Sequence, residues 1–337
     1  MTKLPETTVA QLKAAYGKIA AARDIVLATH ENPDADGIGA MLAFALYLNA
    51  ARKRVTVWGS GMIPRHLSFL PGFPLLTERF PKRLPDLVVA FDYGSRVRLR
   101  LEKVGAEHIP LIGFDHHPPD NAHHTEDENT LALVDVSFSS SSEMAYYFFV
   151  TNDIAITQDM ATCLYAGIVH DTGGFSHSNT SPRTFAAASA LAALGVDIER
   201  AAKRLLGLPS YAAAHVAGLA LSRMTLDKAT GVAYSYLGPD DLAATGTTWD
   251  DADTIVHLMN DINAPEVSCI ILFKNRGTGV ISASFRSDAE RRFDARKLAQ
   301  IFGGGGHVYA AGAKIEGELH EVIASVLDQA KRGNFAV

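Results

Sequence analysis

Short apolar runs alternate with helical segments through the first half of this 337-residue chain. The runs cover residues 25–29, 54–58, 86–91, 110–114 and 131–134. A helical pattern covers residues 38–51, and further helices are expected over residues 159–169 and 182–194. Strands that are apolar on both faces and alternate with helices are typical of a mostly parallel sheet flanked by helices. The sequence therefore predicts an α/β fold for this half of the chain.

The character of the sequence changes after Gly195. An Ala- and Leu-rich helical segment over residues 197–221 precedes apolar runs at residues 232–237, 267–274 and 278–284. The chain is long enough for two domains with separate cores. We expect a catalytic domain over residues 1–190, a helical linker over 191–215 and a smaller α/β domain over 216–337, with a cleft between the domains.

Composition excludes several classes of protein. A hydrophobic content of 47% with 20% charged residues is that of a globular protein. No apolar run reaches the roughly 18 residues of a membrane span, and residues 1–24 are typical of an amphipathic helix rather than a signal peptide. Cys163 and Cys269 are too few for a disulfide framework, which predicts a cytoplasmic protein.

The formal net charge of −6 bears on the partners of the chain. A sequence-independent grip on long nucleic acid usually needs a basic surface, so we expect no long nucleic acid partner. A small nucleotide or short RNA held in one pocket stays compatible with this charge. The sequence leaves open whether the chain acts alone or as a homodimer.

The first polar cluster covers residues 29–39, where the first predicted strand ends and a helix begins. It contains His30, Asp34 and Asp36. In open α/β sheets, the crevice at the carboxyl ends of the strands is where ligands bind. The alternative is an Asx-rich turn in which Asp36 lies near a helix N-cap.

Similar clusters follow other predicted elements. Asp92 and the triplet Asp115-His116-His117 each stand directly after an apolar run. Two adjacent imidazoles contribute little to a turn. Asp171 follows the predicted helix over residues 159–169, where a negative charge opposes the helix macrodipole by up to about 1 kcal/mol. A nearby cation would explain an aspartate at that position.

Four aspartates in one crevice would repel one another and raise their pKa values unless cations held them. Two divalent ions bridged by carboxylates, roughly 3.5–4 Å apart, would solve this problem. A set of four aspartates and two histidines without cysteine is too rich in carboxylates for a structural zinc site. We therefore expect two Mn²⁺ ions, with Mg²⁺ or Co²⁺ as substitutes.

The order and spacing of these residues resemble the four motifs of the DHH phosphoesterases. That superfamily includes the RecJ exonuclease, family II pyrophosphatases, exopolyphosphatases and the NrnA group of nanoRNases and pAp phosphatases. The matching residues are His30-x-x-x-Asp34-x-Asp36, then Asp92, Asp115-His116-His117 and Asp171. The first motif here reads Asp-Ala-Asp-Gly where many relatives have Asp-Gly-Asp-Ala, which predicts a changed turn and helix start.

The C-terminal half carries a second resemblance. Residues 284–287, and the glycine run, His307 and Ala-Ala-Gly within residues 302–312, resemble the DHH-associated domain. That domain belongs to the RecJ and NrnA branch, and the compact chain is similar in size to NrnA-like enzymes. Residues 139–143 and 178–182 also resemble NrnA-like segments, where helix capping and substrate contact are the alternative roles.

The resemblance implies a role for each matching residue. One metal ion would be held by His30, Asp34 and Asp92, and the other by Asp36, Asp92, His116 and Asp171. His117 would face the scissile phosphate, and Asp115 would orient an imidazole.

The glycine run also suggests a phosphate site on physical grounds. One glycine suffices to end the helix expected over residues 294–302, whereas further glycines cost backbone entropy. They allow backbone N–H groups to approach an anion closely. We expect Gly304, Gly305, Gly306, His307 and Arg286 to bind a phosphate of the substrate, with a plain turn as the alternative.

The resemblance implies in-line attack on phosphorus by a water activated by both metal ions. The expected substrates are short oligoribonucleotides and 3′-phosphoadenosine 5′-phosphate (pAp). The alternative within the same mechanism is hydrolysis of c-di-AMP or of its linear product pApA. A non-catalytic nucleotide-binding module is a third interpretation, which the complete set of ligands disfavours.

Overall fold

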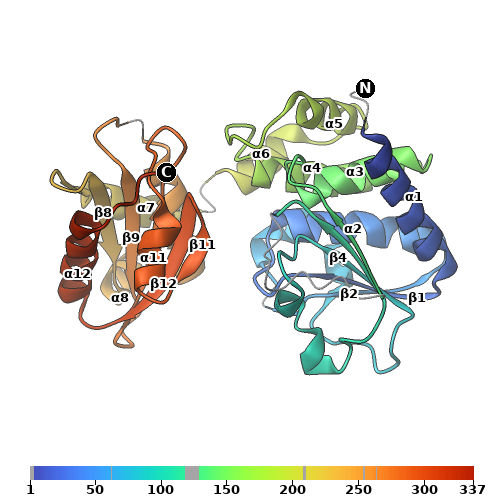
Figure 1. Cartoon of the computed structure of the whole chain (residues 1–337), viewed down its shortest axis with the longest axis horizontal. Coiled ribbons are helices and arrows are strands. Elements are labelled where there is room, and N and C mark those ends of the chain that lie inside the picture. The colour runs from blue at the N-terminus through green and yellow to red at the C-terminus, as the bar shows by residue number, and fades with distance from the viewer. Residues whose placement is uncertain (1–3, 62, 118–128, 208–209, 253–254, 263) are drawn as a thin grey trace. The chain divides into compact units, whose positions relative to one another are not determined.

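The computed structural model describes residues 4–61, 63–117, 129–207, 210–252, 255–262 and 264–337. The chain divides into two compact units, Met1–Gly207 and Leu208–Val337 (Figure 1). The helical segment expected over residues 197–221 is two helices, α6 (Ile198–Leu205) in the first unit and α7 (Tyr211–Ser222) in the second. No helix in the described part of the chain is both long and apolar enough to cross a bilayer.

The first unit is built on a six-stranded sheet in the order β3-β2-β1-β4-β5-β6, and every pair in it is parallel. The strands are β1 (Asp24–Thr29), β2 (Arg54–Trp58), β3 (Leu76–Thr77), β4 (Leu87–Phe91), β5 (Leu111–Asp115) and β6 (Thr130–Val134). The predicted parallel α/β fold is therefore confirmed. Only β3 was missed, because a two-residue strand leaves no apolar run.

Helices cover one face of this sheet and short 3-10 helices cover the other. The helices next to the sheet are α1 (Glu6–Ala21), α2 (Ala35–Ala50) and α3 (Ser141–Thr151), and α4 (Gln158–Asp171) and α5 (Pro182–Ala192) form a further layer packed on these helices. The opposite face packs against η3 (Arg96–Leu99) and η4 (Leu101–Val104). The remaining short turns are η1 (Arg65–Phe69) and η2 (Phe73–Leu75).

Helix α2 is apolar around most of its circumference because it lies between the sheet and α4 (Figure 1). The ring centroid of Phe44 on α2 lies 4.8 Å from those of Phe91 and Phe149. Such aromatic pairs contribute about 0.5–1.5 kcal/mol each beyond the burial of their area. The middle of α2 is thereby packed against the end of β4 and against α3.

Glycines bring α2 and α4 into backbone contact. A β-carbon on Gly39 of α2 would lie 2.4 Å from the carbonyl oxygen of Cys163 on α4. A β-carbon on Gly167 of α4 would lie 2.0 Å from Ser142 Oγ and 2.8 Å from Asp36 Oδ1. A larger residue at Gly39 therefore requires the helices to separate, and one at Gly167 requires the side chains of Ser142 and Asp36 to move.

The second unit contains a mixed six-stranded sheet in the order β11-β12-β10-β9-β8-β7, in which only β8 and β9 are parallel. The strands are β7 (Thr225–Asp227), β8 (Val232–Leu237), β9 (Cys269–Asn275), β10 (Val280–Arg286), β11 (Gly305–His307) and β12 (Ala310–Glu316). The helices are α7, α8 (Pro239–Thr245), α9 (Trp249–Ala252), α10 (Ile255–Asn260), α11 (Ala295–Ile301) and α12 (Leu319–Arg332). The predicted second α/β domain is confirmed.

Candidate metal centre

The turn after β1 places Asp34 at the start of α2. Asp34 Oδ1 accepts hydrogen bonds from the backbone N–H groups of Asp36, at 2.9 Å, and Gly37, at 3.3 Å. Asp34, rather than Asp36, is thus the N-cap of the helix. Its other oxygen, Oδ2, lies 3.8 Å from His30 Nε2. One carboxylate therefore caps the helix and faces an imidazole at the same time.

Asp36 is fully buried beneath this turn. Its Oδ2 accepts a hydrogen bond from Ser141 N at 2.7 Å, and its Oδ1 accepts one from Ser142 N at 2.8 Å. These two amides belong to the first turn of α3. Each carboxylate oxygen has a second lone pair, so the contacts leave Asp36 able to bind a cation.

Asp92 lies at the centre of the cluster. It follows β4 with a φ of 47°, a left-handed conformation that aspartate adopts more readily than most residues. Its Oδ2 lies 3.2 Å from His30 Nε2, and its Oδ1 lies 3.3 Å from His117 Nδ1 and 3.7 Å from His116 Nε2. Both oxygens of this one carboxylate therefore face imidazoles.

The triplet after β5 points its side chains in different directions. Asp115 is buried, and its Oδ2 accepts a hydrogen bond from Gly94 N at 2.6 Å. Its Oδ1 lies 2.8 Å from His117 Nδ1. His116 Nε2 lies 2.9 Å from Asp171 Oδ2, yet among the described residues it has no hydrogen-bond partner of acceptable geometry. Proximity without that geometry is expected of two groups that bind a common ion.

Asp171 is the last residue of α4, as the sequence predicts for an acid at the end of a helix. The residue before it, His170, was not among the predicted ligands. His170 Nε2 lies 3.8 Å from Asp34 Oδ2. The only signal in the sequence was its position beside Asp171, and half-exposed histidines in a last helical turn are common for the favourable dipole interaction alone.

The structure brings the predicted residues of the first unit together. Four groups of side chains have potential ligand atoms within 4.8 Å of one another: His30-Asp34-Asp92, Asp36-His116-Asp171, Asp92-His116-His117 and Asp34-His170-Asp171. The first two match six of the predicted ligand positions, and Asp92 belongs to two of the groups. Which residue holds which ion stays a prediction.

The electrostatics of the cluster fit bound cations. Burial would lower the pKa of His30, but the carboxylates of Asp34 and Asp92 outweigh it and raise that pKa to about 9. Burial and the charge of Asp92 raise the pKa of Asp36 to about 6. Burial and the charge of Asp36 raise the pKa of Asp171 well above its ordinary value. His30 and Asp171 therefore hold their protons more tightly than usual, and a metal ion that binds them must displace these protons.

In the second unit, Arg286 ends β10 and is half-buried. Its Nη1 donates to the carbonyl oxygen of Phe285 at 2.9 Å, and its Nε finds no acceptor among the described residues. Burial lowers the pKa of its guanidinium. A buried cation without a carboxylate partner is costly, and an anionic ligand would relieve this cost.

The glycine run has partly structural causes. Gly303 follows α11 with a φ of 70°, which ends the helix. A β-carbon on Gly304 would lie 2.2 Å from Gly312 O, and one on Gly306 would lie 2.5 Å from Ala310 O. Gly305 differs, because its β-carbon would meet nothing within 4 Å. Gly304 and Gly306 are therefore needed where the chain packs against β12. Packing does not explain the glycine at position 305.

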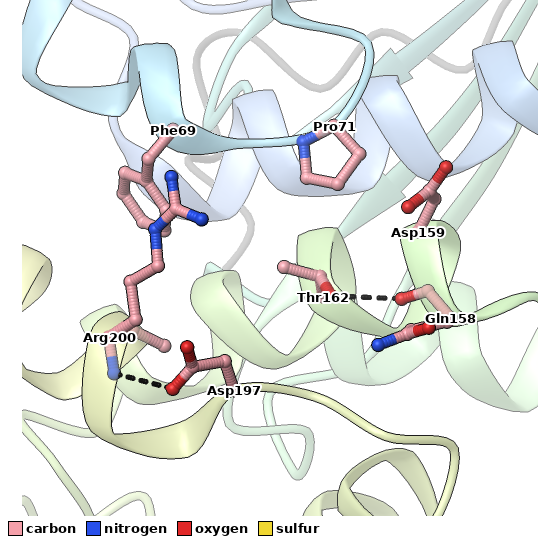
Figure 2. A pocket seen from close by; sticks show the side chains of 8 residues that line it. Phe69, Pro71, Gln158, Asp159, Thr162, Asp197 and Arg200 are labelled. Atoms are coloured by element: carbon pink, nitrogen blue, oxygen red, sulfur yellow. Dashed lines mark hydrogen bonds between the residues drawn. The ribbon is translucent and has the colours of Figure 1, made fainter.

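A separate pocket of about 240 Å³ lies near the start of α4 (Figure 2). Its polar groups serve the fold: Asp197 Oδ1 accepts from Arg200 N at 2.9 Å, and Gln158 Nε2 donates to Gly195 O at 2.6 Å. The 14 residues of α4 separate this end from Asp171 by roughly 20 Å at 1.5 Å per residue. The pocket is therefore not part of the metal centre.

The described residues form an α/β protein of two units, with a cluster of carboxylates and imidazoles that could hold metal ions at the carboxyl edge of a parallel sheet. Residues 24–168 match the DHH family, N-terminal domain, and residues 229–332 match the DHHA1 domain. The chain is 30% identical to the bifunctional oligoribonuclease and PAP phosphatase NrnA of Thermus thermophilus, over 90% of this chain and 88% of that protein. The chain therefore belongs to the DHH family and is a phosphoesterase, a metal-dependent hydrolase of phosphoester bonds.

Two solved structures share the fold. An exopolyphosphatase-related protein from Bacteroides fragilis superposes with a TM-score of 0.84 at 24% identity, covering 96% of both chains. RecJ from Thermus thermophilus in complex with Mn²⁺ superposes with a TM-score of 0.52 at 16% identity, covering 98% of this chain and 55% of that one. At these identities the likeness concerns the fold alone.

Proposed function

We propose that the chain hydrolyses 3′-phosphoadenosine 5′-phosphate and short oligoribonucleotides with the help of two Mn²⁺ ions. The observation that carries this proposal is the cluster of His30, Asp34, Asp36, Asp92, His116 and Asp171, whose nitrogen and oxygen donors suit Mn²⁺. The NrnA relative from Thermus thermophilus is named for both substrates, and RecJ was solved with Mn²⁺. The buried free thiols of Cys163 and Cys269 support a cytoplasmic location.

The side chains divide the work of the reaction. When bound, the cations would lower the pKa of a water molecule and neutralise charge on the phosphoryl oxygens. The carboxylates of Asp92 and Asp36 would hold the cations and so fix the position of their positive charge. His117, held through Nδ1 by Asp115, donates a hydrogen bond from its imidazole to the scissile phosphate. No covalent intermediate on the protein is needed.

The second unit binds the part of the substrate that does not react. Arg286 supplies a half-buried positive charge whose Nε has no acceptor among the described residues, and the open backbone at Gly305, with the neighbouring His307, supplies room and donors. Together they bind a second phosphate, which distinguishes pAp and dinucleotides from simple esters. Gly304 and Gly306 shape the strand that carries these groups.

Hydrolysis of c-di-AMP or pApA uses the same groups and is the alternative substrate choice. Purified full-length chain with Mn²⁺ is to be assayed against pAp, RNA oligomers, pApA and c-di-AMP, with Asp92→Asn as the control for contaminating enzymes. We expect the highest kcat/KM on pAp or RNA oligomers. Preference for c-di-AMP would reverse the substrate choice. Binding without turnover of any of these would favour a non-catalytic nucleotide-binding module.

A further inference from the structure

Asp36 is held by a helix that contributes no side chain to the predicted ligand set. The first-turn amides of Ser141 and Ser142 on α3 donate to its two carboxylate oxygens at 2.7 and 2.8 Å. Ser142 Oγ also donates to the backbone carbonyl of Asp36 at 3.1 Å. The two amide hydrogen bonds fix the plane of this carboxylate, and the hydroxyl hydrogen bond fixes the backbone that carries it. The orientation of Asp36 is thus set by the start of α3.

The start of α3 is in turn set by Glu143. Ser140 is the N-cap, because its Oγ accepts a hydrogen bond from Glu143 N at 3.0 Å. The fully buried carboxylate of Glu143 also binds Ser139, the residue before the N-cap. Its Oε2 accepts hydrogen bonds from Ser139 N at 2.9 Å and from Ser139 Oγ at 2.7 Å. The backbone that leads into the helix is therefore fixed by one buried charge.

Glu143 has a buried cationic partner from another helix. Arg183 on α5 donates from Nε to Glu143 Oε1 at 2.8 Å, and its guanidinium lies 3.7 Å from the centroid of the Phe138 ring. Thr184 Oγ1 donates to Oε2 at 3.1 Å. Buried ion pairs often stabilise a fold no more than apolar residues of the same size. A role in conformational specificity explains this pair better than a role in stability.

Hydrogen bonds from Asn179 also connect Ser139 to the backbone of Asp171 at the end of α4. Asn179 Nδ2 donates to Ser139 O at 2.9 Å and to the backbone carbonyl of Asp171 at 3.2 Å. Ser139 is thus bound by Glu143 through its N–H and O–H and by Asn179 through its carbonyl. Through these bonds the backbones that carry Asp36 and Asp171, both predicted ligands of one ion, are connected.

We propose that Glu143 is a positioning residue of the metal centre, which acts through Ser139 and together with Asn179 to hold the carboxylate of Asp36 in place for its cation. The proposal rests on the proposed function in one respect, that Asp36 binds a cation. Residues that orient metal ligands typically change metal affinity about 10- to 100-fold when they are replaced.

The test measures Mn²⁺ binding to the metal-free full-length chain by isothermal titration calorimetry and by electron paramagnetic resonance of unbound Mn²⁺. Glu143→Gln keeps the size of the side chain but replaces an acceptor oxygen with a donor. We expect the weaker of two Mn²⁺ affinities to fall about tenfold or more. Asn152→Ala is the matched control, because Asn152 bonds Phe148 O at the other end of α3 and makes no contact with Asp36. It should lower the unfolding temperature and leave both affinities unchanged.

The outcomes separate the two proposals. If Glu143→Gln unfolds at a lower temperature but binds Mn²⁺ as wild type does, Glu143 only stabilises the fold and the inference is wrong. If Glu143→Gln does not fold, Asn179→Ala decides: it leaves no buried charge unpaired, and unchanged Mn²⁺ binding in this variant also overturns the inference. Failure of the wild-type chain to bind Mn²⁺ would instead overturn the proposed function.

Discussion

His117 Nδ1 lies 2.8 Å from Asp115 Oδ1, and the same carboxylate binds the backbone N–H of His117 at 3.1 Å and that of Gly94 at 2.6 Å. A carboxylate at Nδ1 fixes the tautomer of the imidazole and the orientation of its ring. The adjacent His116 instead directs Nε2 toward Asp171. Both imidazoles face Asp92, but the carboxylate nearest to His117 is that of Asp115 and the one nearest to His116 is that of Asp171, which is the basis for assigning them different roles.

Replacement of His117 tests this division. We expect His117→Ala to keep both Mn²⁺ ions and to lose about 10²- to 10⁴-fold in kcat, the contribution typical of a positioned hydrogen-bonding group. Metal content is to be measured by mass spectrometry after gel filtration, with His116→Ala as the comparison that should lose metal. Loss of one equivalent of manganese from His117→Ala would make His117 a ligand.

Removal of metal should abolish activity. We expect no turnover after dialysis against EDTA, and recovery that is greater with Mn²⁺ than with Mg²⁺, because imidazole donors suit Mn²⁺ better. Initial rates across a titration of each metal provide the measurement. Full activity in protein shown to be free of metal would contradict the two-metal mechanism.

Binding of Mn²⁺ should release protons. The pKa of His30 is raised to about 9 in the metal-free protein, so this imidazole is protonated at neutral pH and must lose its proton to bind a metal ion. The affinity for Mn²⁺ should therefore increase with pH up to about 9, as His30 loses its proton. It should decrease more steeply as the pH drops below about 6, where Asp36 also takes up a proton. Calorimetry in buffers of different ionisation enthalpy measures the release. An enthalpy independent of the buffer would show that His30 is not a ligand.

The role of Arg286 is tested by comparing two substrates. A charge-assisted hydrogen bond to phosphate is worth roughly 1.5–3 kcal/mol. Arg286→Ala should therefore lower kcat/KM on pAp about ten- to a hundredfold. Hydrolysis of bis-p-nitrophenyl phosphate, which has no second phosphate, should be almost unchanged. An equal loss on both substrates would place Arg286 at the reacting phosphate or in support of the fold.

Two glycines of the same run offer a matched pair. Gly304→Ala forces a β-carbon to within 2.2 Å of Gly312 O and should destabilise the second unit by about 1–3 kcal/mol. Gly305→Ala meets no atom within 4 Å and should leave the unfolding temperature unchanged. If Gly305 admits a phosphate, its substitution raises KM for pAp nonetheless. Thermal denaturation and kinetics of both variants separate packing from substrate contact, and an unchanged KM would remove Gly305 from the phosphate site.

Much of the first unit could be predicted because its strands are buried on both faces. β4 and β5 are wholly buried, so each appears in the sequence as an unbroken apolar run followed by its polar residues. The convergence of Asp92 and Asp115 then follows from the parallel sheet, since strands that run in the same direction end at the same edge. The short edge strand β3 gives no such signal.

Other features depend on distant contacts that leave no local pattern. The hydrogen bonds from Ser141 and Ser142 to Asp36 cross more than a hundred positions of the sequence. The glycine run was interpreted as a phosphate loop, yet Gly304 and Gly306 are required where β11 approaches β12. Local composition cannot distinguish a glycine that admits a ligand from one that admits a neighbouring strand.

The backbone contact of α2 with α4 at Gly39 and Gly167 also affects the metal centre. Asp36 lies in the first turn of α2 and Asp171 ends α4, so the spacing of two predicted ligands depends on how closely the helices pack. Ions differ in radius and preferred coordination geometry. We therefore expect ion selectivity to depend on the packing of these two helices. Substitutions that enlarge either glycine should change which cation the centre accepts before they unfold the domain.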